Sequence, residues 1–514
     1  MILWINMEKR LIVAIALSLL VLLSWSALMP KPQPIAVQEV VVQRGALHQP
    51  NIEHAVVATP STPPPPGRLI NYKQDNFDIT FDESIAAIKD VSFRNYNNYL
   101  FTLSYGCLLK DPLLNFKQER VQDNSISFIA KTSEKEVLKK YTFHKSSYTI
   151  DLEIEIRNKS SVPISINLPL VLGVLDFSAS NHQARFQDIT ISTADKMLRN
   201  NGRKNTSFEQ VKFLGLRDQY FTAIIESHQG YQPGFVLKLN NNASEVGLNV
   251  QNEEIQPGAK IGHLYHIYIG PQDLKIFNSI NPAWGSIIHY GTFDFISQIL
   301  LQTLDFLHKI VRNWGVAIIL LSLLVYLILY PLSIKQMRSM KEMQALQPKV
   351  EALRKANKDN PQKMNKEIME LYKEHKVNPL GGCLPLLLQM PIFFALYNAL
   401  MRSIVLKGAG FFWIKDLSAP DRLWIFPSSW PNLPILGNEL NLLPIIMAIG
   451  MFVQQKISSI SSGGSAAEQQ KIMLILMPII FGLIFYRMPS GLVLYWFVNS
   501  LLMLIFQLRM NRAR

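Results

Sequence analysis

The residue types that most often carry chemistry are scattered along this 514-residue chain. Its ten histidines form no His-Glu-x-x-His pair, and its two cysteines are too few for a disulfide framework or a four-cysteine zinc site. The sequence also contains no glycine-rich phosphate loop of the P-loop form. Ser490-Gly491 invites a serine-nucleophile interpretation, but the neighbouring hydrophobic stretches offer no histidine partner. We therefore expect no catalytic residues, no cofactor, no metal and no enzyme activity.

A second set of polar residues lies inside long hydrophobic stretches, where polar side chains are costly and rarely face lipid. These side chains offer hydrogen bonds rather than bond-making chemistry. For each of them, a simple hydrogen bond between neighbouring helices is the alternative interpretation. The set consists of Ser322, Gln389, Asn398, Gln454, Gln455, Asn499 and Gln507.

Composition favours a membrane protein as the framework for these residues. Hydrophobic residues make up 48% of the chain and charged residues only 17%, whereas soluble domains carry about 25% charged residues. The formal net charge is +13. A net positive charge can indicate binding to nucleic acid or to acidic lipid, or it can set the topology of a membrane protein. The positions of the charges along the chain distinguish these three explanations.

The N-terminal region predicts a membrane anchor over residues 1–29. Its uncharged run from Leu11 to Met29 is long enough to cross the hydrocarbon core. A cleaved signal peptide is the alternative, because a positive flank fits both, but Trp25 makes a poor cleavage site. Residues 30–67 are rich in proline and predict a semi-rigid, extended linker.

Residues 68–283 predict one all-β domain on the outer side of the membrane. The clearest strand is Ile150–Arg157, where apolar and charged residues alternate strictly. Turn signals such as Asn201-Gly202 punctuate the region, and long helical patterns between strands are missing. We expect a two-sheet β-sandwich.

Helical periodicity replaces alternation from about residue 284. Residues 284–312 predict an amphipathic helix, lying either in the membrane interface or against the β domain. Its apolar face consists of Phe293, Ile296, Leu300, Leu304, Leu307 and Val311. Five hydrophobic stretches then fill residues 313–508, at 314–332, 380–400, 440–453, 472–486 and 492–508. With the anchor they predict a multi-domain membrane protein with an α-helical core of six spans.

The charges predict the topology, because cytoplasmic loops carry the excess of Lys and Arg. The segment 334–378 holds 11 Lys and Arg against 6 Asp and Glu, and the short basic tail 509–514 holds three arginines and no acidic residue. Both segments lie on one side of a six-span protein, whereas the β domain is nearly neutral. We therefore expect cytoplasmic termini, a β domain on the opposite side of the membrane, and no DNA as partner.

The cytoplasmic segment 334–378 predicts a helical hairpin that turns at Asn357–Pro361. A methionine-rich face is soft and can repack around varied apolar partners, although methionine filling an ordinary packed interface is the alternative. The residues expected to contact an apolar partner are Met337, Met340, Met343 and Met364.

Three motifs carry a resemblance to a known family. They are Val377–Pro385 continuing through Gln389-Met390-Pro391-Ile392-Phe393, Tyr330-Pro331-Leu332, and Met488–Trp496. Together with the architecture they closely resemble the YidC membrane protein insertase family of Gram-negative bacteria. The resemblance covers essentially the whole chain and is densest from residue 314 to 508.

This resemblance implies a membrane insertase and folding chaperone of the bacterial inner membrane, with the β domain in the periplasm and five C-terminal spans that form a polar groove. The groove would be open to cytoplasm and lipid and closed to the periplasm, and the hairpin would recruit substrate near its mouth. The resemblance also implies a supersandwich as the β domain. By motif position, Ser322 and Trp496 resemble substrate-contacting residues. The expected groove residues are Ser322, Tyr326, Gln389, Asn398, Gln454, Gln455, Tyr495, Trp496 and Asn499.

The implied partners are nascent membrane proteins, the Sec translocon, the ribosome and signal-recognition machinery, and the phospholipid membrane. Because the tail after the last span is short and carries few basic residues, we expect direct ribosome binding to be weak. The main alternative function is a transporter or channel with a periplasmic sensor domain. That function would favour repeated spans or charged residues at mid-membrane, and neither is evident in the sequence.

One position departs from the family pattern. Relatives place an arginine five residues before the proline of Tyr330-Pro331-Leu332, where this chain has Tyr326. A tyrosine keeps a hydroxyl but lacks the fixed charge, and a buried arginine costs about 2.5–3.5 kcal/mol on insertion scales. We therefore hypothesise a groove that works by hydrogen bonding and hydration, with little demand for negative charge on the substrate.

Overall fold

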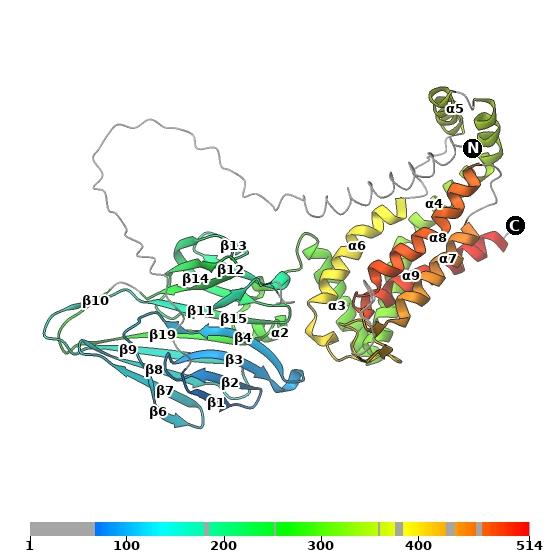
Figure 1. The fold of residues 1–514 in the computed structure, drawn as a ribbon. Helices are drawn as coiled ribbons and strands as arrows, with labels where there is room; N and C mark the ends of the chain where they lie inside the picture. The colour runs from blue at the N-terminus through cyan, green and yellow to red at the C-terminus, as the bar shows by residue number, and fades with distance from the viewer. Residues whose placement is uncertain are drawn as a thin grey trace, which may run out of the picture. The chain divides into compact units, whose positions relative to one another are not determined.

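The computed structural model describes residues 67–512 except 179–183, 251–252, 358–359, 376–383, 428–436 and 459–464. The predicted anchor and nearly all of the predicted linker lie outside the described residues. The described chain forms a β-rich region followed by a helical region, as the colour gradient of Figure 1 shows.

Two large antiparallel sheets build the β domain. The smaller sheet has the order β1-β2-β3-β4, with bounds Leu69–Lys73, Phe77–Asp82, Ala87–Phe93 and Tyr99–Gly106. The larger, 13-stranded sheet has the order β5-β11-β17-β16-β14-β15-β19-β9-β8-β7-β6, with β12 and β13 branching from β14. The bounds along this path are Leu108–Leu109, Pro169–Asp176, Ala243–Asn249, Gln232–Asn240, Thr206–Arg217, Phe221–Ser227, Lys260–Pro271, Thr149–Asn158, Lys135–Phe143, Ser125–Lys131 and Lys117–Gln122, and those of β12 and β13 are Asp188–Thr193 and Met197–Asn200. Two small ribbons pair β10 (Ile164–Ile166) with β18 (Glu253–Ile255) and β20 (Trp424–Ile425) with β21 (Glu439–Leu440).

Strand β9 confirms the strand predicted from alternation. Its apolar residues are fully buried and its charged residues lie on the opposite face, where side chains alternate with a period of two. The buried set is Ile150, Leu152, Ile154 and Ile156. Their face forms the interior layer between the two sheets, so the pattern also fixes the register of β9 against its neighbours.

Aromatic side chains join the two sheets into the expected sandwich. Phe81 of β2 packs on Tyr141 of β8 with ring centroids 5.0 Å apart. Phe93 of β3 stacks on Phe221 of β15 at 4.1 Å. Such pairs bury large apolar areas with defined geometry, so they fix the smaller sheet over the larger one.

Lys139 is a basic side chain in the interior of the β domain, and it is fully buried. Its Nζ donates to the carbonyls of Ala86 at 2.6 Å and Cys107 at 2.5 Å. Both acceptor residues have left-handed backbones, with φ of 47° and 63°. Burial lowers the pKa of the Lys139 amine to about 7. The amine therefore satisfies two buried carbonyls at the ends of β3 and β4 that regular strand pairing leaves open.

The connection to the helical region corrects one predicted boundary. Residues Pro282–Ile287 form a short 3-10 helix whose Trp284 is buried in the β domain. The amphipathic helix α3 is Asp294–Val311, so it begins ten residues later than expected. Gly291 between them has φ of +86°, a conformation that favours glycine and ends the helical path. The β domain therefore includes residues that periodicity had assigned to the helix.

The helical region confirms helices at all five predicted hydrophobic stretches. The helix bounds are α2 Leu274–Ile280, α4 Trp314–Ala356, α5 Pro361–Glu374, α6 Leu384–Met401, α7 Leu442–Ser458, α8 Ser465–Phe485 and α9 Ser490–Arg512. Within the described chain, Trp314–Ile334 and Ser490–Arg509 are long and apolar enough to cross a membrane, and Leu442–Ile457 and Leu474–Phe485 are shorter apolar helices. One helix, α4, contains both the second predicted span and the first arm of the hairpin, and it continues through Pro331 and Pro348.

The apolar face predicted for α3 packs inside the helical region. Leu300 and Leu304 are buried in the same cluster as residues of α4 and α6. Ser297 strengthens this packing, because its Oγ donates to the carbonyl of Ala395 at 2.8 Å. A second apolar stripe remains exposed on the outer side of the helix, formed by Phe295, Ile299, Phe306 and Ile310.

Candidate functional site

A hydrogen bond between α6 and α9 is the clearest polar feature among the predicted groove residues. Gln389 Nε2 donates to Tyr495 Oη at 2.7 Å. Tyr495 is fully buried, so its hydroxyl depends on this amide for a partner. One turn later, Asn499 Nδ2 donates to the carbonyl of Tyr495 at 3.0 Å. The structure thus brings together three of the nine residues expected from the sequence.

Helix α4 presents Ser322 and Tyr326 on one face, four residues apart. Ser322 is buried, and its Oγ donates to the carbonyl of Ile318 in the same helix at 2.8 Å. The Oη of Tyr326 is buried and has no hydrogen-bond partner among the described residues. Its ring lies 6.2 Å from that of Tyr330. A buried hydroxyl without a partner costs roughly 1–3 kcal/mol, so this position favours any polar group that reaches it.

Of the remaining predicted groove residues, Trp496 packs among aromatic side chains, and Gln454 and Gln455 lie on another helix. Trp496 belongs to an aromatic cluster, with its ring 5.3 Å from Phe393 and 5.3 Å from Phe485. This cluster joins α6, α8 and α9 and gives Trp496 a packing partner on each. Gln454 and Gln455 lie half-buried on α7, and the Oε1 of Gln455 has no partner among the described residues.

Asn398 lies away from the Gln389–Tyr495 pair, toward the start of α3. A Cβ placed on Gly291 would lie 3.9 Å from the Nδ2 of Asn398. Its position nine residues after Gln389 on α6 therefore puts it near the connection from the β domain. Joint lining of one surface by Asn398 and Gln389 stays a prediction.

The hairpin has the predicted two arms and turn. Leu346 and Val350 of α4 are buried where that helix meets α5. Met364 is half-buried on α5, whereas the side chains of Met337, Met340 and Met343 lie outside the described part of the chain. Met369 on α5 is 56% exposed, and sequence reasoning missed it, although its spacing of five from Met364 was visible.

Sequence reasoning also missed a polar cluster at the start of α7. Asp421 is 2% exposed, and its Oδ2 accepts from the backbone amides of Leu442 and Leu443, both at 2.8 Å, and from Trp413 Nε1 at 3.1 Å. Asn441 Nδ2 donates to the carbonyl of Tyr486 at 2.8 Å. Asn441 before an apolar run was a visible helix-start signal, whereas the contact of Asp421 across 21 residues was not.

Comparison with known proteins connects these features to a family. The family described as 60Kd inner membrane protein matches residues 306–514, and the YidC periplasmic domain matches residues 115–303. The membrane protein insertase YidC of Citrifermentans bemidjiense is 30% identical over 570 residues, covering 99% of this chain and 99% of that protein. The chain belongs to the YidC membrane protein insertase family.

A second relative and one solved structure are also similar to this chain, and the relative agrees with its membership in YidC. The membrane protein insertase YidC of Pelobacter propionicus is 35% identical over 386 residues, covering 73% of this chain and 69% of that protein. A solved structure, described as an active YidC insertase with the first transmembrane domain resolved, is 19% identical. It covers 85% of this chain and 92% of that one, with a TM-score of 0.41.

Membership in YidC confirms the main functional predictions. The chain is a membrane protein insertase of the inner membrane, with a periplasmic domain typical of the Gram-negative form. Its substrates are nascent membrane proteins, and the family is not an enzyme family. The β-sandwich is the periplasmic domain and the helices α4 to α9 belong to the insertase core.

Proposed function

We propose that this insertase carries hydrophobic segments into the bilayer along a polar groove between its core helices, open to cytoplasm and lipid. It works alone or beside the Sec translocon, and the ribosome and signal-recognition machinery deliver substrates to it. Transfer of the polar groups of a nascent tail into hydrocarbon is strongly unfavourable. A hydrated groove that extends part of the way through the bilayer shortens the distance that these groups must cross without water. Hydrophobic partitioning of the segment then drives the last step.

The observation that carries this proposal is the set of polar atoms held inside apolar helices. The Gln389–Tyr495 hydrogen bond and the buried Tyr326 hydroxyl lie on three different helices of the core. Each of these side chains can instead form a hydrogen bond with a peptide group of a substrate that passes along the groove. An amide and a phenol do this without a fixed charge, so tails of any charge are served.

Replacing the pair together, as Gln389→Leu with Tyr495→Phe, should slow insertion of a small single-span protein by about fivefold. That factor corresponds to one lost hydrogen bond of about 1 kcal/mol. Pulse-labelling in cells depleted of their own insertase measures it. Removing both partners leaves no buried polar atom unpaired, so the variant should accumulate normally.

Ser500→Ala is the matched control for this pair. Its Oγ donates to the carbonyl of Trp496 within α9 at 3.0 Å, so its loss removes a polar atom from the same helix without touching the pair. Insertion at the wild-type rate is expected. Wild-type insertion by the double variant, at equal protein level, would remove the support for the groove.

We also propose six spans with both termini in the cytoplasm, on the support of the basic segment 334–378. Cysteine labelling tests this in a chain carrying Cys107→Ser and Cys383→Ser. A cysteine at Leu239, which is 43% exposed on β16, should react with a membrane-impermeant reagent in spheroplasts. A cysteine at Met369 on α5 should react only after lysis. Equal labelling of both before lysis is incompatible with this topology.

The exposed apolar stripe of α3 supports an interfacial position for that helix. Phe295 is 78% exposed and Phe306 61% exposed, while the opposite face of the helix packs on α4 and α6. Immersing such a stripe in the acyl boundary removes its apolar surface from water.

The exposed Met369 and the half-buried Met364 support a second proposal, that the hairpin recruits apolar segments of the substrate.

A further inference from the structure

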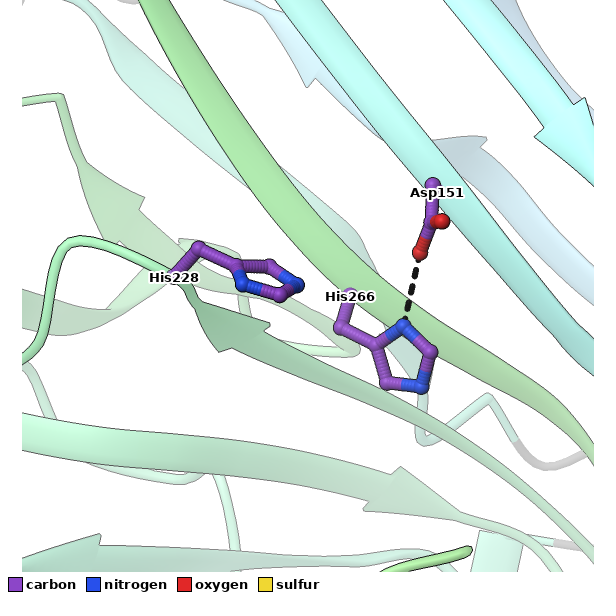
Figure 2. Close-up of side chains that lie close together, drawn as sticks. All are labelled: Asp151, His228 and His266. Atoms are coloured by element: carbon purple, nitrogen blue, oxygen red, sulfur yellow. Dashed lines mark hydrogen bonds and ion pairs between the residues drawn. The ribbon is translucent and has the colours of Figure 1, made fainter.

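Four neighbouring strands of the periplasmic domain bring three histidines and one aspartate together. Asp151 on β9 lies directly opposite His266 on β19 in the register of the sheet. His228 directly follows β15, the other neighbour of β19, and His144 directly follows β8, the other neighbour of β9. Figure 2 shows Asp151, His228 and His266 close together, with the hydrogen bond between Asp151 and His266 drawn.

The distances between the polar atoms of this cluster are short. His266 Nδ1 lies 2.7 Å from Asp151 Oδ1, and His144 Nε2 lies 2.8 Å from Asp151 Oδ2. One ligand atom each from Asp151, His228 and His266 falls within 4.8 Å of the others. The three side chains therefore point their donor atoms at one small volume.

Surrounding residues hold two of these side chains in place. The indole of Trp284 stacks on the His266 ring with centroids 5.6 Å apart. Trp284 is itself fixed, because its Nε1 donates to Glu226 Oε2 at 2.8 Å. On the other side, the His144 ring occupies the second oxygen of the Asp151 carboxylate. Such outer contacts orient the ligands of metal sites.

We propose that Asp151, His228 and His266 bind a divalent transition-metal ion, for which Zn²⁺ is the best match, while His144 orients the carboxylate. Two imidazoles and one carboxylate form a ligand set that Zn²⁺ prefers, with a fourth position left for water. Ligand atoms around a tetrahedral Zn²⁺ lie about 3.4 Å apart. Binding would widen the 2.7 Å between Asp151 Oδ1 and His266 Nδ1 to that spacing, and the exposed His228 side chain has room to turn toward the ion.

A surface ion pair between Asp151 and its two histidine neighbours is the simpler explanation of the same contacts. It accounts for His144 and His266, but not for His228, whose ring lies edge-on to that of His266 at 6.1 Å and brings a third ligand atom within 4.8 Å of the other two. Sequence analysis predicts no metal here, because the ligands of this site come from separate strands. Their spacings of 77 and 38 residues match no metal-binding motif.

Zn²⁺ titration of the full-length, detergent-solubilised protein, first stripped with a chelator, tests the site. Isothermal titration calorimetry should find one equivalent bound, and both His228→Ala and His266→Ala should weaken binding by at least about tenfold. Zn²⁺ should also raise the melting temperature of the wild-type protein, and much less that of either variant. His228→Ala removes an exposed ring and keeps the Asp151–His266 contact, so its fold is retained.

His375→Ala provides the matched control, because His375 is an exposed histidine on the hairpin, where its Nε2 contacts Lys349 Nζ at 3.1 Å. It should bind Zn²⁺ as the wild-type protein does. Absence of Zn²⁺ binding by the wild-type chain would overturn the proposal. So would unchanged affinity in both cluster variants, or a loss of binding confined to His375→Ala.

Discussion

Replacing Asp421 with alanine should lower the melting temperature of the detergent-solubilised insertase core by about 6–12 °C, since a domain of this size loses about 2–4 °C per kcal/mol. Asp421 Oδ2 accepts three hydrogen bonds, two of them from the first amides of α7. A carboxylate at a helix N-terminus also interacts favourably with the helix dipole. Losing these interactions should cost about 3 kcal/mol in total.

Asp416→Ala is the control for this variant, because Asp416 lies in the same loop. Among the described residues, its carboxylate accepts from the backbone amide and the hydroxyl of Ser418, two residues away. Such a local turn contributes little, so the melting temperature should fall by less than half as much. Thermal-shift measurements on both variants decide the matter. Equal shifts would mean that Asp421 contributes no more than a turn residue.

Arg217→Met should have the largest effect on the periplasmic domain, with a loss of about 3–5 kcal/mol in stability. Arg217 is 1% exposed, and its Nε and Nη2 donate to the two carboxylate oxygens of Asp188 at 2.6 and 2.7 Å. Its Nη1 also donates to the carbonyls of Ile287 and His289 at 3.1 and 3.2 Å. Methionine fills the space but leaves Asp188 and both carbonyls without their partner.

Arg94→Met distinguishes this effect from the loss of any arginine. Arg94 makes a similar two-pronged contact with Asp78, but its side chain is 41% exposed and water replaces the contact. The temperature at which protease digests the domain should fall sharply for Arg217→Met and hardly at all for Arg94→Met. Adding Asp188→Leu to Arg217→Met should recover part of the loss. Failure of that recovery would show that the buried charge is not the cause.

The sequence predicts local structure well in this chain and remote contacts poorly. Alternation over Ile150–Arg157 predicts β9, and long apolar stretches predict the five hydrophobic helices α4 and α6 to α9, because both signals come from neighbouring residues. The structure starts α3 later than the periodicity predicts, because the apolar residues Trp284 and Ile287 fill the core of the β domain instead of continuing a helical face. Burial in another unit overrode the helical period.

The same difference between local signals and remote contacts applies to the residues of the candidate site. Polar residues inside hydrophobic stretches were visible as a set, but the pairing of Gln389 with Tyr495 joins residues 106 apart. Asp421, Arg217 and the histidine cluster stayed hidden for that reason, since each depends on side chains contributed by separate elements. The role of Tyr326 in the groove, inferred from its motif position, stays a prediction, and the structure adds that its hydroxyl is buried without a partner among the described residues.

The central claim is that hydrogen bonding, without a fixed positive charge, serves substrates in the groove. The direct measurement is pulse-labelled insertion of one single-span protein, with its acidic tail intact or neutralised, in depleted cells supplied with this chain. Both substrates should insert at rates within about twofold, because no charge attraction is lost, and Tyr326→Arg should introduce a preference for the acidic tail. A strong demand for the acidic tail by the wild-type chain would contradict the claim.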